Sequence, residues 1–217
     1  MALAIFDLDN TLLAGDSDYL WGQFLIKEGI VNKDYYEREN QRYYDEYKAG
    51  TMDIFEFLAF SLKPLSEHSM ETLNQWHKTF IDQEIQKILL PKAFDLIKAH
   101  KEKGDTLMII TATNRFVTAP IAELLGIQHL LATDPEIVDG RYTGKVEGTP
   151  CFQEGKVKRL TQWLASENTD LVGSWFYSDS HNDLPLLKKV ENPVVVDADE
   201  PLTLYAKEQN WKMMSLR

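Results

Sequence analysis

A short apolar run near the N-terminus, within "AIFDLDNTLL" (residues 4–13), ends directly in two aspartates, Asp7 and Asp9. The run at residues 3–6 has no polar residue, which is typical of a short strand buried on both faces of a parallel sheet. Such a strand needs a neighbouring strand on each side and helices over both faces. Because two carboxylates at its end repel each other, we expect a cation beside them.

Similar apolar runs recur along the chain and alternate with helical patterns. They predict further strands at residues 107–110, 129–132, 175–177 and 193–196. Helices are predicted between them at residues 91–103, 115–125 and 156–166, where Pro or Gly marks several of the ends. An Asp-Gly pair in "EIVDGRYTG" (136–144) predicts a small hairpin. This alternation predicts an α/β fold with a Rossmann-like parallel sheet.

Residues 15–88 depart from that alternation. They hold amphipathic runs at 19–28, 54–62 and 73–85 and no convincing buried strand. We therefore expect a helical domain over 15–88, called the helical insert below, within a catalytic core made of residues 1–14 and 89–217. The tyrosine-rich, acidic stretch 35–47 is either a solvated helix that packs its tyrosines on neighbours or a ligand-facing surface.

Composition excludes several classes of partner. The 34 acidic residues outnumber the 23 basic ones and give a net charge of −11, which disfavours nucleic acid. No segment resembles a signal peptide or approaches the length of a membrane span, so we expect a cytoplasmic protein without a membrane partner. The single cysteine, Cys151, excludes an internal disulfide. No pattern indicates the oligomeric state.

Polar side chains follow several of the predicted strands. Asp7 and Asp9 follow the first strand, Thr111 follows "LMII", and "SDSHND" (178–183) follows "WFY". Lys156 begins the helix that precedes this last strand. Since ligands bind beyond the carboxyl ends of parallel strands, we expect all of these residues to share one crevice.

The chemistry of this crevice favours phosphoryl transfer. Mg²⁺ suits a few carboxylates with room for phosphate, and Asp7 and Asp179 are the expected ligands. A metal and a lysine together favour a phosphoryl group as substrate. Asp7 is placed to act as a nucleophile that forms an aspartyl-phosphate. Asp9 could serve as general acid and then as general base.

Four motifs, "DLDNT" (7–11), "IITAT" (109–113), Lys156 and "SDSHND" (178–183), resemble, in order, the signature motifs of the haloacid dehalogenase superfamily of phosphatases. The position of the helical insert resembles that of the phosphoserine-phosphatase-like branch. The resemblance implies an enzyme that hydrolyses a small phosphate ester with Mg²⁺ and no organic cofactor. The helical insert itself predicts motion, with candidate hinges at Gly15 and near residues 89–91 through which it closes to exclude water and reopens to release product.

The resemblance also implies a role for each matching position. Asp7 would be nucleophile and metal ligand, and Asp9 would be the acid/base that also binds metal through its backbone carbonyl. The other roles implied are a metal ligand at Asp179, support of the metal site by Asp183, phosphate binding by Thr111, Ala112 and Lys156, and a place near phosphate and substrate for Asn182. His181 is expected at the rim of the site.

The substrate hypothesis depends on two positions in the helical insert. Asp16 resembles the acidic residue that binds the substrate amino group in phosphoserine phosphatases. The arginine that those enzymes use for the substrate carboxylate falls here at Ser61, and no arginine lies between Arg42 and Arg115. An amine-bearing ester without a carboxylate fits better, and histidinol phosphate is the leading hypothesis. Asp16 could equally serve as a helix N-cap, and both roles are compatible.

Other functions stay open at this point. The chain could be a phosphoserine phosphatase or another small-metabolite phosphatase. It could be a phosphotransferase that passes the same aspartyl-phosphate to an alcohol. From a different class, it could be a catalytically silent binding protein on the same fold.

Overall fold

The computed structural model describes residues 2–217 and contains a seven-stranded sheet in the order β4-β3-β2-β1-β5-β6-β7. The strands are β1 (Leu3–Phe6), β2 (Thr106–Asn114), β3 (His129–Val138), β4 (Arg141–Glu147), β5 (Trp175–Ser178), β6 (Asn192–Val196) and β7 (Lys212–Met214). Neighbouring strands run parallel from β3 to β7, and β4 pairs antiparallel with β3. The predicted α/β fold is confirmed, and β1 lies at the centre of the sheet.

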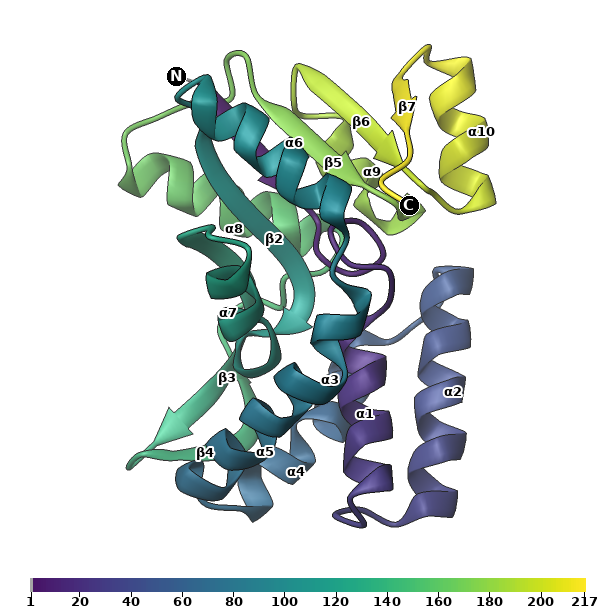
Figure 1. Cartoon of the computed structure of the whole chain (residues 1–217), viewed down its shortest axis with the longest axis vertical. Helices are drawn as coiled ribbons and strands as arrows, with labels where there is room; N and C mark the ends of the chain where they lie inside the picture. The colour runs from purple at the N-terminus through teal and green to yellow at the C-terminus, as the bar shows by residue number, and fades with distance from the viewer. Residues whose placement is uncertain (1) are drawn as a thin grey trace.

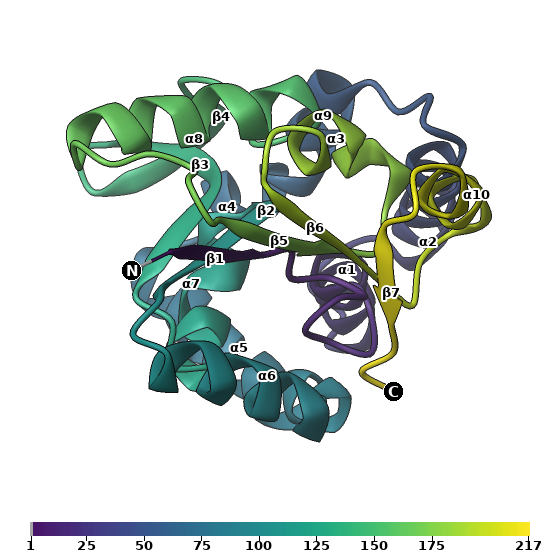
Figure 2. The ribbon, with the colours of Figure 1, turned by 90° about the horizontal axis from the view of Figure 1, so that it is seen from above.

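Helices cover both faces of the sheet, as Figure 2 shows. Alternate residues of β1 face opposite sides: Ala4 and Phe6 belong to one core cluster and Leu3 and Ile5 to the other. The first cluster includes residues of α6 (Pro91–Glu102) and α7 (Arg115–Leu124). The second includes residues of α8 (Glu154–Ser166), α9 (Leu184–Leu187) and α10 (Glu200–Glu208). The all-apolar composition of β1 follows from this double burial.

The strands differ in length from the prediction in two places. β2 continues to Asn114, past the predicted end at 110, and the predicted hairpin is the tip of the longer β3–β4 pair. Its turn residues Asp139 and Gly140 both have positive φ angles, 49° and 74°, as an Asp-Gly turn requires. The sequence analysis missed β7, whose residues are mostly exposed at the sheet edge.

Between β1 and α6 the chain forms the helices of the insert, which gather in the lower half of Figure 1 beside β4. They are α1 (Ser17–Lys27), α2 (Lys33–Ala49), α3 (Ile54–Ser61), α4 (Lys63–Glu67), α5 (Met70–Gln83) and the 3-10 turn η1 (Ile85–Ile88). The segments that lead into and out of the insert lie side by side, because Leu13 and Leu89 form an antiparallel bridge and the Ala14 amide donates to the Ile88 carbonyl at 2.8 Å. The two chain segments that connect the insert to the core are therefore paired with each other.

Across residues 2–217, no helix is both long and apolar enough to span a bilayer.

Candidate active site

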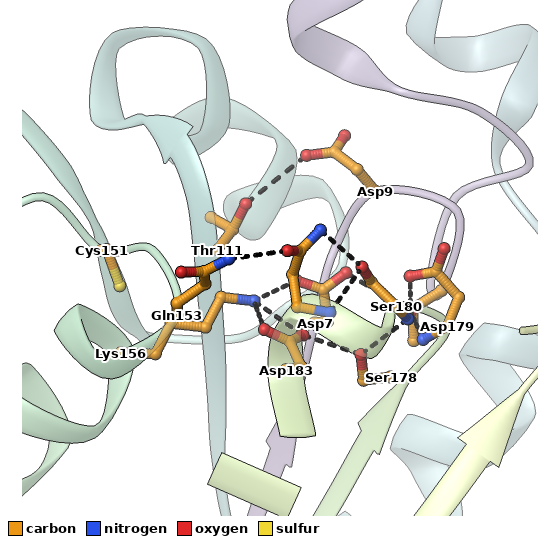
Figure 3. Close-up of polar contacts among 12 residues, drawn as sticks. Asp7, Asp9, Thr111, Cys151, Gln153, Lys156, Ser178, Asp179, Ser180 and Asp183 are labelled. Carbon is orange, nitrogen blue, oxygen red and sulfur yellow. Dashed lines mark hydrogen bonds and ion pairs between the residues drawn. The ribbon is translucent and has the colours of Figure 1, made fainter. Parts of the chain in front are cut away.

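The loop after β1 places Asp7 in the interior beside Lys156. The Asp7 amide donates to the Tyr177 carbonyl of β5 at 2.9 Å, so the Asp7 side chain lies at the carboxyl end of β1, next to β5. Lys156, in the first turn of α8, lies 2.7 Å from Asp7 Oδ1 and 2.7 Å from Asp183 Oδ1. Figure 3 shows the ammonium group between the two carboxylates. All three side chains are buried, so Lys156 holds two carboxylates together away from water.

Burial dominates the electrostatics of this group. It raises the pKa of Asp7 from 3.8 to about 7, although the Lys156 ammonium opposes that shift. Burial by itself would lower the pKa of Lys156, but the charges of Asp183 and Asp7 outweigh it and raise the pKa above 10.5. Lys156 therefore stays protonated at neutral pH, and its single charge faces two carboxylates.

A second carboxylate pair meets at the Thr11 hydroxyl. Thr11 Oγ1 lies 3.0 Å from Asp179 Oδ1 and 3.4 Å from Asp7 Oδ2, and it accepts the Asp179 amide at 3.1 Å. Burial, followed by the charge of Asp7, raises the pKa of Asp179 well above its ordinary value. Within residues 2–217, no group of three or more His, Cys, Asp or Glu side chains is arranged to hold a metal ion. The side-chain ligands available at this point are thus two carboxylates.

Asp9 faces the opposite wall of the site and is held by hydrogen bonds. Its Oδ1 accepts the Ser17 amide at 2.6 Å, and its Oδ2 accepts the Thr113 hydroxyl at 2.8 Å and the Thr111 hydroxyl at 3.4 Å. Burial and then the charge of Asp16 raise the pKa of Asp9 to about 6, although the bonds from Ser17 and Thr113 oppose the shift. A carboxyl group of this kind is mostly protonated below about pH 6 and mostly ionised above it, so both forms are accessible near neutral pH.

A cavity lies between this edge of the sheet and the helical insert. The core contributes Asp7, Asp9, Asn10, Thr111, Ala112 and Thr113, and the insert contributes Asp16, Asp18, Tyr19, Asn40, Tyr43, Tyr44, Tyr47, Met52, Ile54 and Phe57. The tyrosine-rich stretch therefore lines the cavity, and it also packs on neighbours, since Tyr43 and Phe60 have ring centroids 5.3 Å apart. Asp179 lines an adjoining hollow that shares Tyr44 and Tyr47 with the cavity.

Asp16 has the N-cap role that its sequence allowed. Its Oδ1 accepts the amides of Asp18 at 3.0 Å and Tyr19 at 2.9 Å at the start of α1. The same side chain lines the cavity, and burial raises its pKa. Capping and ligand binding are therefore geometrically compatible at this residue.

Asn182 is bound within the protein. Its Nδ2 donates to the Tyr47 carbonyl at 3.0 Å, and its Oδ1 accepts the Gln153 Nε2 at 2.9 Å. It thus ties the loop after β5 to the last turn of α2, and it lies outside the lining of the cavity. His181 beside it bonds Asp199 Oδ2 through Nδ1 at 2.7 Å and lies against Gly50.

The sequence analysis assigned no role to several residues that complete the site. Thr11 is the last residue of the first motif and Thr113 the last residue of the second, so a hydroxyl within a motif was the available signal. Asp18 was visible only as part of "GDSD". No local signal marks Asn114, which reaches Asp18 from 96 residues away in the chain.

Comparison with known proteins shows which sequences and folds this chain resembles. The sequence model of the haloacid dehalogenase-like hydrolases matches residues 4–188. A histidinol-phosphatase of Neisseria meningitidis serogroup C is 43% identical over 99% of each chain. A crystal structure of a Bordetella pertussis protein of unknown function superposes with a TM-score of 0.94 and 43% identity, covering 100% of this chain and 99% of that one. A phospho-aspartyl intermediate analogue of phosphoserine phosphatase shares the fold, with a TM-score of 0.72 and 20% identity over 100% of this chain and 93% of the other.

Proposed function

The chain belongs to the haloacid dehalogenase-like hydrolases, and on this premise we propose that it is a Mg²⁺-dependent phosphatase that hydrolyses histidinol phosphate through an aspartyl-phosphate. The observation that carries the proposal is the cavity that joins Asp7 and Asp9 to an acidic, tyrosine-lined wall. We also propose that residues 1–14 and 89–217 form the catalytic core and residues 15–88 its substrate-covering domain.

In this proposal Asp7 attacks the phosphorus atom and the alkoxide of the ester leaves. The bond between Lys156 and Asp7 supports the role, because the ammonium stabilises the ionised nucleophile and can neutralise a phosphoryl oxygen. Thr111 and the backbone of Ala112 line the same cavity and are proposed to bind the phosphoryl oxygens. Asp183 holds Lys156 in place, with Ser178 donating to it at 2.7 Å. Asn182 would act through its contact with α2.

Asp9 is the proposed proton carrier. With a pKa of about 6 it can deliver a proton to the leaving alkoxide. The resulting carboxylate then takes a proton from the water that attacks the aspartyl-phosphate, so the same group serves both half-reactions. Its bonds to Ser17 and Thr113 fix its orientation toward the cavity.

The residues fit a magnesium ion that is held by few protein ligands. Asp7 and Asp179 share the Thr11 hydroxyl, and burial followed by the charge of Asp7 raises the pKa of Asp179. A cation between the two carboxylates would stabilise their ionised forms. We propose these two carboxylates and the backbone carbonyl of Asp9 as ligands, in keeping with the few protein ligands Mg²⁺ usually takes. When bound, the ion would supply charge neutralisation for the phosphoryl group.

The substrate assignment has two supports. The relative with 43% identity over nearly the whole chain carries the name histidinol-phosphatase. No arginine lines the cavity to bind a substrate carboxylate, and Ser61 occupies the position expected for one, whereas Asp16 offers a carboxylate for an amine. An amino-alcohol phosphate therefore fits the cavity better than phosphoserine does.

A panel of phosphomonoesters tests the proposal. Histidinol phosphate, phosphoserine, glycerol phosphate and an aryl phosphate are assayed with Mg²⁺ and with a chelator. We expect kcat/KM to be at least roughly tenfold higher for histidinol phosphate than for phosphoserine, the size of one lost charged contact, and activity to vanish with chelator. Equal turnover of the two esters would refute the substrate assignment. Transfer of phosphate to an added alcohol, detected by product analysis, would instead indicate a phosphotransferase.

A further inference from the structure

Asp18 is a buried carboxylate in the wall of the cavity that the proposed mechanism does not use. It lies in the first turn of α1 and is 9% exposed. Its Oδ1 accepts the Asn114 Nδ2 at 3.2 Å, whereas its Oδ2 has no hydrogen-bond partner anywhere in residues 2–217. One oxygen of a buried acid is thus available at a surface that a ligand would occupy.

The charge of Asp18 also lacks compensation. Burial, and then the charges of Asp16 and Asp9, raise its pKa well above 3.8, and the one opposing influence is the neutral amide of Asn114. The ammonium of Lys48 lowers the pKa of Asp16 instead. A cationic ligand would supply the missing positive charge.

A second acceptor faces the same cavity from α2. Asn40 is 5% exposed and donates its Nδ2 to the Tyr19 carbonyl at 3.1 Å. Its Oδ1 accepts no hydrogen bond from the described part of the chain. Gly22 leaves room for the Asn40 side chain, since a Cβ at position 22 would lie 2.7 Å from Asn40 Nδ2. The wall therefore offers two acceptors to a ligand that carries N–H donors.

A purely structural role does not require the charge at position 18. Asn114 caps α7 by accepting the Val117 amide through Oδ1, so its Nδ2 needs one acceptor. An asparagine at position 18 could supply that acceptor without the cost of burying a carboxylate. The negative charge itself thus calls for a partner from outside the chain.

We propose that Asp18, aided by Asn40, is a specificity-determining residue that binds a second cationic nitrogen of the substrate, distinct from the amine bound by Asp16. This deepens the proposed function and rests on it: the substrate class becomes phosphate esters with two protonatable nitrogens, such as an amine and an imidazolium. Tyr19 lines the same cavity and offers its ring to the cation, whereas the ring of Tyr44 already has the Lys48 ammonium 4.3 Å from its centroid.

The test compares Asp18→Asn with Asp34→Asn, the same chemical change at an exposed position on α2. Steady-state kinetics are measured on histidinol phosphate, phosphoethanolamine, which has the amine alone, and glycerol phosphate, which has neither nitrogen. For Asp18→Asn we expect the kcat/KM ratio of histidinol phosphate to phosphoethanolamine to fall about 10- to 100-fold, mainly through KM, as for loss of a charged hydrogen bond. Asp34→Asn should leave the ratio unchanged.

Binding of L-histidinol, measured by calorimetry, provides a readout that does not need turnover. We expect Asp18→Asn to weaken it about 10- to 100-fold. An unchanged ratio and unchanged histidinol affinity would overturn the inference while leaving the phosphatase proposal intact, and so would an equal loss on all three esters. Wild-type protein that hydrolyses no ester but binds histidinol through Asp18 would instead refute the proposed function and support the subsite.

Discussion

Replacing Lys156 with methionine is expected to destabilise the protein strongly, because it leaves two buried carboxylates without their counter-charge. The side chains of Lys156, Asp7 and Asp183 are 3%, 7% and 3% exposed, and the ammonium lies 2.7 Å from an oxygen of each acid. Removing one partner of a buried ion pair costs about 3 to 5 kcal/mol. A domain of this kind has about 5 to 15 kcal/mol of total stability, so the loss would be a large part of it.

Urea unfolding followed by circular dichroism measures this loss at pH 7.5. Lys158→Met is the matched control, since Lys158 lies on the same helix but is exposed, and its change should stay within about 0.5 kcal/mol. Adding Asp183→Asn to Lys156→Met should recover part of the loss, because one unpaired carboxylate is then removed. A loss below about 1 kcal/mol in Lys156→Met, or no recovery in the double variant, would refute the argument that Lys156 neutralises this cluster.

Three further predictions concern the proposed catalytic pair, Asp7 and Asp9, and the contact between Gly50 of the insert and His181 of the core. Asp7→Asn should lower kcat at least roughly 1,000-fold, as expected for loss of a nucleophile, with Tm kept or raised; residual turnover near the wild-type rate would rule out the aspartyl-phosphate. Burial raises the pKa of Asp7 to about 7 and that of Asp9 to about 6, so the folded protein binds more protons than the unfolded chain between pH 4 and 7. The contribution of these two groups to the free energy of unfolding should therefore fall as pH rises through that range. Thermal unfolding from pH 4.5 to 7.5 checks this sign, and Mg²⁺ should raise Tm more at pH 7.5 than at pH 5. A Tm that rises with pH in the wild type, with the rise abolished by Asp7→Asn, would contradict the prediction. Gly50→Ala should lower the free energy of unfolding by about 1 to 2 kcal/mol, because φ is +70° and the new Cβ would lie 2.7 Å from His181 Nε2. An unchanged urea midpoint would show that the contact between Gly50 and His181 is not tightly packed.

The core strands were predictable because their signal is local. A run such as residues 3–6 is apolar at every position since both of its faces are covered, and that composition is visible without knowing what covers it. β7 lacked this signal, because Lys212 and Met213 are exposed and the strand exists by pairing with β6. The length of the β3–β4 hairpin was also missed, since β4 packs against α3 and α4 of the helical insert, which are distant in the sequence.

The candidate site divides in the same way. Asp7 and Asp9 could be proposed because they follow a strand whose end the sequence reveals. Thr111 was expected after its strand, but it lies within β2, which continues to Asn114. Asp18 could not be proposed, since its neighbours Asn114 and Asp9 become relevant only when the insert folds back over the sheet.

The order of residues along this chain determined the α/β class, the carboxyl-end placement of the aspartates and the helical character of residues 15–88, because strand burial, turn chemistry and helical periodicity act over a few residues. Tertiary structure decided which groups meet. Asp9 and Thr113 bond across 104 residues, and Lys156 reaches Asp7 across 149. Contacts at such separations, and the burial that shifts the pKa of each acid, depend on how helices and strands pack, which no local pattern encodes.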